Sequence, residues 1–193
     1  MENESVEYKK PEVLKLTTPP EWLKPEYIAE KNSFWLHNTS YEYAVIDTAK
    51  IRDDQEEKLE NERLVLPDVF VIRTDGFLAV SDTYPEPYRE LAIIHEVREF
   101  SSIAKSADDG VGENACAEAL AFELDQAKFF RLYAKDMSAY YEFRQSFFNK
   151  LISFYEQYEK TPEQEALLAR MRHSLDYLDE CIGAAGSAER SKS

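Results

Sequence analysis

The sequence predicts an α+β protein that is mainly helical and forms a single domain over residues 1–193. Its composition gives two reasons: 44% of the residues are hydrophobic, enough for one core, and only 5 are glycine, too few for a loop-rich or sandwich-like protein. The third reason is the order of apolar patterns, which are strand-like within residues 41–80 and helix-like from residue 89 onward. We therefore expect a small antiparallel β-sheet, then a helix pair that carries the site, then a C-terminal helical hairpin.

The N-terminal residues 1–30 are expected to form an extended arm. Charged and polar residues surround the four prolines of this segment. Such a composition buries little apolar surface, so the arm should become ordered only where its larger apolar side chains dock. These are Trp22, Leu23 and Tyr27.

The strands are expected between residues 41 and 80. Alternating apolar residues predict a strand over 41–46, and the charged stretch 53–63 predicts a loop or a short exposed helix. Residues 69–74 and 77–80 are rich in β-forming side chains and are separated by Asp75-Gly76, a turn pair that tolerates positive φ. A hairpin is therefore expected here, and its second strand leads directly into the first helix of the site.

Helices are expected over the rest of the chain. The first covers residues 89–105, and a second begins near Asn114 after two glycines, so the two should pair antiparallel. Thr161, followed by Pro162 and then by Gln164, has the pattern of a capping box and predicts a helix start. Gly183 is expected to end that helix, leaving residues 184–193 as a frayed tail. Two apolar stripes should pack together as the C-terminal hairpin, one of Tyr140, Phe143, Phe147, Leu151, Phe154 and Tyr158, the other of Leu168, Met171, Leu175, Leu178 and Ile182.

The charge and the cysteine content limit the partners. A formal net charge of −15 disfavours direct binding to nucleic acid, which depends on Lys and Arg displacing counterions, and suits a basic partner instead. The sequence shows neither a membrane-length apolar run nor a signal peptide, which predicts a cytoplasmic protein with no membrane association. Cys116 and Cys181 make no disulfide framework and are expected to be free thiols. The oligomeric state is left open.

Residues 95–99, His-Glu-Val-Arg-Glu, carry the clearest chemical signal. Residues four apart share a helix face, so His95 and Glu99 can reach one ion together, and Glu96 then stands where a general base is needed. Imidazole and carboxylate groups are suitable ligands for zinc, iron or manganese. In the second helix, Glu123 lies in an otherwise apolar row, which predicts that its side chain is buried within reach of His95 or Glu99. Without a metal, two such close carboxylates would share a proton.

These two segments resemble the zincin metallopeptidases, and among them the small intracellular ImmA/IrrE-type proteins. In that family an H-E-x-x-H helix precedes a helix with the pattern E-x-E-A-N-x-F-A. Residues 116–123, Cys-Ala-Glu-Ala-Leu-Ala-Phe-Glu, are similar to this pattern in their Glu, Ala and Phe positions. The resemblance implies His95 as a metal ligand, Glu96 as the general base, Glu99 as a substituted ligand, and Cys116 or Glu123 as the third ligand.

The resemblance also implies a divalent metal cofactor, zinc foremost, and a peptide or protein substrate. An edge strand would hold the substrate backbone by strand addition, and residues 76–80 are the candidate for this role. The hypothesis is therefore a zincin-like metal-dependent hydrolase. Because two ligand positions are altered, the alternative is a non-catalytic acidic protein that keeps the scaffold and binds a protein partner. In a third interpretation, His95 and Glu99 are only a solvated pair opposite the apolar face of their helix.

Overall fold

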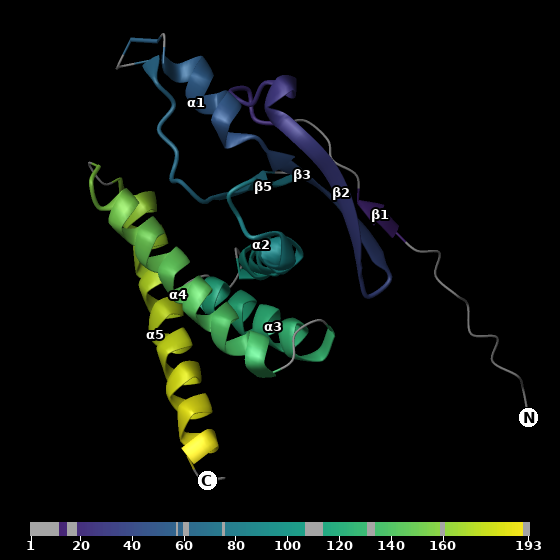
Figure 1. The fold of residues 1–193 in the computed structure, drawn as a ribbon, viewed down its shortest axis with the longest axis vertical. Coiled ribbons are helices and arrows are strands. Elements are labelled where there is room, and N and C mark those ends of the chain that lie inside the picture. The colour runs from purple at the N-terminus through teal and green to yellow at the C-terminus, as the bar shows by residue number, and fades with distance from the viewer. Residues whose placement is uncertain are drawn as a thin grey trace, which may run out of the picture.

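The computed structural model describes residues 12–14, 19–56, 58–59, 62–74, 76–106, 114–130, 134–158 and 161–190. Figure 1 shows helix α2 (Arg89–Ser106) end-on, with the β-sheet on one side and the helices α3 (Ala115–Phe130), α4 (Ala134–Tyr155) and α5 (Pro162–Arg190) on the other. The predicted class, α+β and mainly helical in a single domain, is confirmed. None of the described helices is long and apolar enough to cross a membrane.

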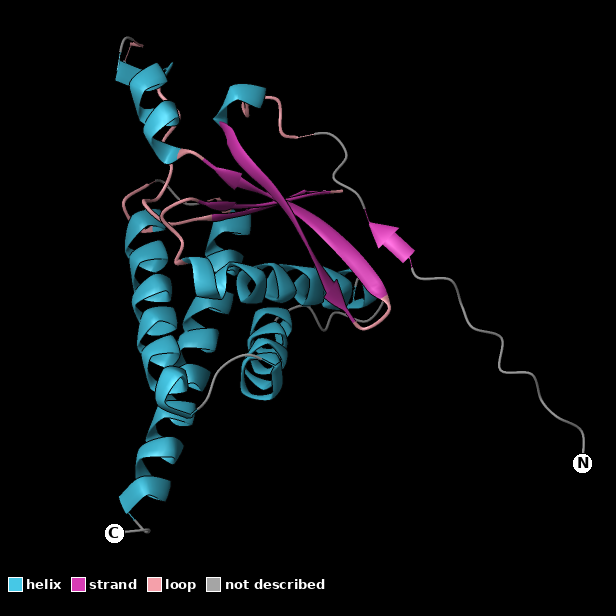
Figure 2. Ribbon diagram, turned by 45° about the vertical axis from the view of Figure 1, so that its right-hand side comes forward, coloured by secondary structure: helices cyan, strands magenta, loops and turns pink. Residues whose placement is uncertain are grey.

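The sheet is mixed, so the prediction of an antiparallel sheet is wrong in this respect. Strand β3 (Thr39–Ile46) pairs antiparallel with β2 (Ile28–Leu36) and parallel with both β1 (Glu12–Leu14) and β5 (Phe77–Ser81). Parallel neighbours require a crossover connection, which here includes helix α1 (Thr48–Glu56). Figure 2 shows the twisted sheet lying over a helix that runs beneath it, with the longer helices extending away from the sheet.

The predicted hairpin after residue 69 is confirmed. Strand β4 (Val71–Thr74) pairs antiparallel with β5, and Thr74 faces Phe77 across the turn. Gly76 has φ of 79°, a conformation that glycine adopts without strain, whereas Asp75 lies outside the described residues. Because β5 pairs with β3 on one side and with β4 on the other, the candidate segment 76–80 does not form an edge strand, and its predicted role in strand addition is wrong.

The segment before β3 is more ordered than a predicted arm. Leu23 and Tyr27 are buried as predicted, and the Tyr27 hydroxyl donates to Asp54 of α1 at 2.5 Å. Strand β2 begins at Ile28 and forms a hairpin with β3, closed by a turn in which His37 has φ of 54°. The arm over residues 1–30 therefore ends earlier than predicted, and most of residues 1–18 lie outside the described residues.

The helices follow the sequence signals closely except at the C-terminal end. Helix α2 matches its prediction, and the contacts Ser102–Glu118 and His95–Glu123 confirm that α2 and α3 run antiparallel. The link over residues 107–113 lies outside the described residues.

Helix α5 begins at the predicted capping box but does not end at Gly183. The Thr161 hydroxyl accepts from the Gln164 backbone N–H at 3.3 Å, while the Gln164 side-chain oxygen accepts from the Thr161 N–H at 3.1 Å. The helix continues to Arg190. The predicted helix end at Gly183 is therefore wrong, and so is the predicted start of a frayed tail at residue 184. A glycine inside a helix is tolerated at a cost of about 1 kcal/mol, and Figure 1 shows these last turns extending past α4.

Candidate functional site

Helix α2 places His95, Glu96 and Glu99 against the other helices. His95 is 4% exposed and Glu99 is 8% exposed, so the interpretation of a solvated pair is wrong. The reason is that α2 is covered on one side by the sheet and on the other by the helical layer, leaving only part of its surface in water. The Glu96 side chain is 21% exposed and lines the same cavity as the other two residues.

Helix α3 brings Cys116 to this group. Its buried Sγ lies 3.5 Å from Nε2 of His95. One ligand atom from each of His95, Glu99 and Cys116 can be chosen so that all lie within 4.8 Å of one another. Imidazole nitrogen, carboxylate oxygen and thiolate sulfur are all ligands of divalent transition metals, so this buried group can hold a metal ion.

Glu123 lies on the other side of the His95 ring and is fully buried, as the sequence predicted. Its Oε2 lies 2.8 Å from Nδ1 of His95 and accepts from Nη2 of Arg144 at 3.1 Å, while its Oε1 accepts a hydrogen bond from the Tyr140 hydroxyl. Because both oxygens have these partners, Glu123 positions His95 and does not belong to the group of ligand atoms formed with Glu99 and Cys116.

The charge of Glu123 is compensated within the core. Burial alone would raise the pKa of Glu123, but Arg144, His95 and Tyr140 outweigh it and hold this pKa below its ordinary value. A carboxylate so paired does not need a shared proton. The hydrogen-bond and ion-pair partners of Glu123 among the described residues are Arg144, His95 and Tyr140, so the close approach to Glu99 on which the predicted proton sharing depended is not found.

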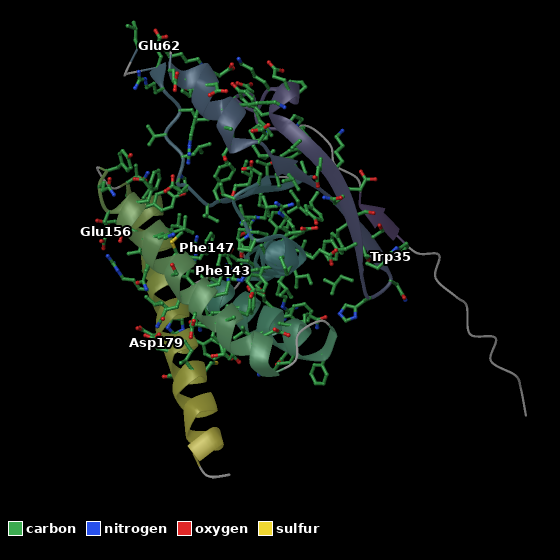
Figure 3. The ribbon with its side chains drawn as sticks, viewed as in Figure 1. Trp35, Glu62, Phe143, Phe147, Glu156 and Asp179 are labelled. Carbon is green, nitrogen blue, oxygen red and sulfur yellow. The ribbon has the colours of Figure 1, made fainter. Side chains whose placement is uncertain are left out.

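Arg144 is the site residue that the sequence analysis missed. It is 2% exposed, its Nε lies 2.9 Å from Oε1 of Glu123, and its Nη1 donates to the Tyr84 hydroxyl at 3.2 Å. Its guanidinium carbon lies 5.0 Å from the ring centre of Phe147 and 4.7 Å from that of Phe148. Figure 3 labels Phe147 and Phe143 on α4, next to α2. A signal was available, since Arg144 lies four residues after Tyr140 on the apolar stripe of α4.

The pKa values of His95 and Glu96 are also perturbed. Burial lowers the pKa of His95, but Cys116 and Glu123 outweigh burial and raise it to about 10. Burial raises the pKa of Glu96; His95 and Arg73 oppose this change, and the neighbouring Glu99 reinforces it. Clusters of buried groups with shifted pKa values are typical of functional sites.

A cavity of about 380 Å³ opens onto this group. One part of its lining is polar and includes His95, Glu96, Glu99 and Cys116, together with Arg73 from β4 and Arg170 from α5. The other part is apolar and is formed by residues of α4 and α5 and of the segment before β4, among them Phe147, Phe148, Leu151, Leu167, Met171 and Phe70. The volume lies within the usual range for small-ligand sites, about 300–1,000 Å³.

Comparisons with family models, with curated proteins and with solved structures found no match for this chain. The function is therefore argued from the site.

Proposed function

We propose that the cavity binds a divalent metal ion, zinc foremost, through His95, Glu99 and Cys116, and that the protein is a metal-dependent hydrolase of the zincin type. The observation that carries the proposal is the orientation of His95. Glu123 fixes Nδ1 at 2.8 Å, so that Nε2 faces the thiol of Cys116 and the cavity. Metal-binding histidines are commonly held in this way by a carboxylate on the ring nitrogen that does not bind the metal.

The donor set fits zinc and leaves room for chemistry. Zinc binds Cys, His and Glu ligands at about 2.0–2.3 Å in tetrahedral geometry, and catalytic sites keep the fourth position open. The separations of at most 4.8 Å among the three ligand atoms therefore require only small side-chain movements. A single metal with three protein ligands is the arrangement expected for hydrolysis and not for a closed structural site.

A bound divalent ion would polarise a substrate carbonyl and lower the pKa of water at the open position. Glu96 follows His95 in the sequence and lines the cavity, so its carboxylate can accept a proton from that water and return it to the leaving group. Glu123 and Arg144 hold His95 in place, and apolar residues form the rest of the cavity lining. A peptide bond is the default substrate, because the site resembles that of the zincins.

One observation favours a second candidate function, a thiol hydrolase without metal. Cys116 Sγ lies 3.5 Å from Nε2 of His95, and Nδ1 of the same ring lies 2.8 Å from Oε2 of Glu123. These contacts connect a nucleophile, a base and an orienting carboxylate. Because the pKa of His95 is raised to about 10, His95 would hold the proton before substrate binds, and the Cys116 sulfur would attack a carbonyl carbon as the thiolate. The leaving group departs with the proton from His95, forming a thioester that water then hydrolyses.

Metal content separates the two candidates. We expect protein purified without chelator to carry one zinc per chain and to lose it on His95→Ala, whereas His173→Ala, a change at an exposed histidine of α5, retains it. Added zinc should raise the melting temperature, because a ligand that binds only the native state stabilises it. No metal in the purified protein, and no stabilisation by zinc, manganese or iron, would contradict the metal-dependent hydrolase.

Variants of the two proposed catalytic groups complete the test. Glu96→Gln should retain zinc and lose peptide hydrolysis, while Cys116→Ser should lose zinc. If instead the metal-free protein hydrolyses a thioester or peptide and iodoacetamide inactivates it through Cys116, the thiol hydrolase is supported. Cys181→Ser is the matched control, since Cys181 lies outside the cavity lining. If Glu96→Gln leaves the biological activity intact, the result favours the non-catalytic interaction protein.

A further inference from the structure

Two arginines from different elements lie beside the candidate ligand group. Nη1 of Arg73, on β4, lies 3.6 Å from Oε2 of Glu99 and 3.5 Å from Oε2 of Glu96. Nε of Arg170, on α5, lies 3.9 Å from Oε1 of Glu99. Both arginines line the cavity, and so does Arg144. Three cationic side chains therefore surround this cavity, although the chain has a net charge of −15.

The pairing of these arginines with Glu99 is loose. Distances of 3.6 and 3.9 Å exceed those of hydrogen bonds, and no hydrogen bond joins Glu99 to either arginine among the described residues. Nε of Arg170 is buried and has no hydrogen-bond partner within the described part of the chain. A buried donor without a hydrogen bond is unfavourable, so its presence beside a cavity points to a ligand that it contacts.

A metal ion would change what these arginines face. Glu99 has one carboxylate, and if it binds the ion, its charge is directed away from Arg73 and Arg170. Arg170 then faces the polar end of the cavity, next to the open metal position, without its counter-charge. Arg73 keeps its hydrogen bond to the Glu96 carbonyl and its pairing with the Glu96 carboxylate, and its remaining N–H groups can bind an anion. This step rests on the proposed metal-dependent hydrolase.

We propose that the substrate is a peptide with a free C-terminal carboxylate, which Arg73 and Arg170 bind while the apolar lining holds the last side chain. Arginine binds a carboxylate through paired N–H groups, which gives both affinity and orientation. The apolar part of the lining, including Phe148, Leu151 and Met171, favours an apolar C-terminal residue over a free inorganic anion. The enzyme would then remove residues from the C-terminal end of a peptide.

The test measures binding of two short peptides to the zinc-loaded full chain. N-acetyl-leucyl-phenylalanine, with a free carboxylate, and its C-terminal amide are titrated by calorimetry against protein whose zinc content is measured in the same sample. The use of Glu96→Gln protein prevents turnover during the titration. We expect the acid to bind roughly tenfold or more tightly than the amide, as charge-assisted hydrogen bonds imply.

Variants on one helix identify the source of this preference. Arg170→Gln should remove most of the preference while the zinc content and melting temperature stay unchanged. Arg172→Gln is the matched control, because Arg172 is 51% exposed on the same helix and pairs with Glu156 outside the cavity lining. If Arg170→Gln reduces stability, Arg73→Gln provides the same test from β4.

The outcomes distinguish this inference from the proposed function. Bound zinc with equal affinity for acid and amide overturns the carboxylate proposal alone, as does a preference that survives both arginine substitutions. Inorganic phosphate that displaces the acid at equal concentration would show a general anion site and also overturn it. Protein that binds no zinc overturns the proposed metal-dependent hydrolase and, with it, this inference.

Discussion

Nδ1 of His95 lies 2.8 Å from Oε2 of Glu123, although the two residues are 28 positions apart in the chain. The contact joins α2 to α3, and Arg144 and Tyr140 extend it to α4. Each of these side chains is buried, and another member of the group balances its charge or forms its hydrogen bond. Removing one member should therefore affect folding as well as the site.

Glu123→Gln should destabilise the protein by about 3–5 kcal/mol, because it leaves the buried guanidinium of Arg144 without a counter-charge. Urea unfolding followed by circular dichroism measures the change. Glu118→Gln, at an exposed position of the same helix, should stay within about 0.5 kcal/mol of the wild type. If Glu123→Gln lowers the free energy of unfolding by less than about 1 kcal/mol, buried Arg144 does not need Glu123 as its counter-charge.

Tyr140→Phe should cost less, about 1–2 kcal/mol, since Glu123 loses one donor but keeps Arg144 and His95. Tyr158→Phe, at a residue that is 43% exposed, is the control and should have almost no effect. Combining Tyr140→Phe with Glu123→Gln should cost less than the sum of the single changes, because both remove the same contact. Strict additivity would contradict the network.

Thr161→Ala should destabilise the protein by about 1 kcal/mol, because it removes the hydroxyl that accepts from the Gln164 N–H at the start of α5. Thr161→Ser keeps this hydroxyl and should retain most of the stability. Thermal unfolding of the three proteins side by side measures the difference. Equal melting temperatures for all three would mean that packing alone sets the start of the helix.

Acid should weaken the start of α1 through Asp47. Its Oδ1 accepts from the Lys50 backbone N–H at 3.1 Å, and chiefly this hydrogen bond holds the pKa of Asp47 below its ordinary value. A lowered folded-state pKa means that the contribution is complete above the ordinary value of about 3.9 and is lost as pH falls through the folded value.

Asp47→Asn keeps a capping side chain but cannot titrate in this range. The wild type should therefore lose stability relative to Asp47→Asn as the pH falls from about 6 to about 3, measured by urea unfolding at each pH. Parallel pH profiles for the two proteins would contradict the role of Asp47.

Local signals in the sequence predicted much of this fold. The turn pair at Asp75-Gly76 and the capping box at Thr161 each act within a few residues, so the hairpin and the start of α5 could be read directly. Glu123 could be placed in the core because it was the one carboxylate of an apolar helical row. These predictions depend on backbone geometry and burial and not on distant contacts.

Features set by distant contacts could not be predicted. Strand β2 lacks apolar alternation because much of it is exposed, and its central Glu30, Lys31 and Asn32 are not typical strand residues. Glu99 lies off the apolar face of α2 and is buried although the helical wheel placed it toward solvent. No periodicity indicates that the carboxylate of Glu123 meets the guanidinium of Arg144.

The candidate site cannot be cut out of this protein as a helix pair. The candidate ligands all lie on α2 and α3. The counter-charge of Glu123 nevertheless comes from α4, and the two cavity arginines beside Glu99 come from β4 and α5. A peptide carrying only α2 and α3 would keep the contact between His95 and Glu123. It would leave the Glu123 carboxylate without the counter-charge of Arg144 and the hydrogen bond from Tyr140. A distant relative with the same site should therefore also have an arginine in the apolar stripe of the helix that follows the Glu123 helix. A short motif around His95 does not include this arginine.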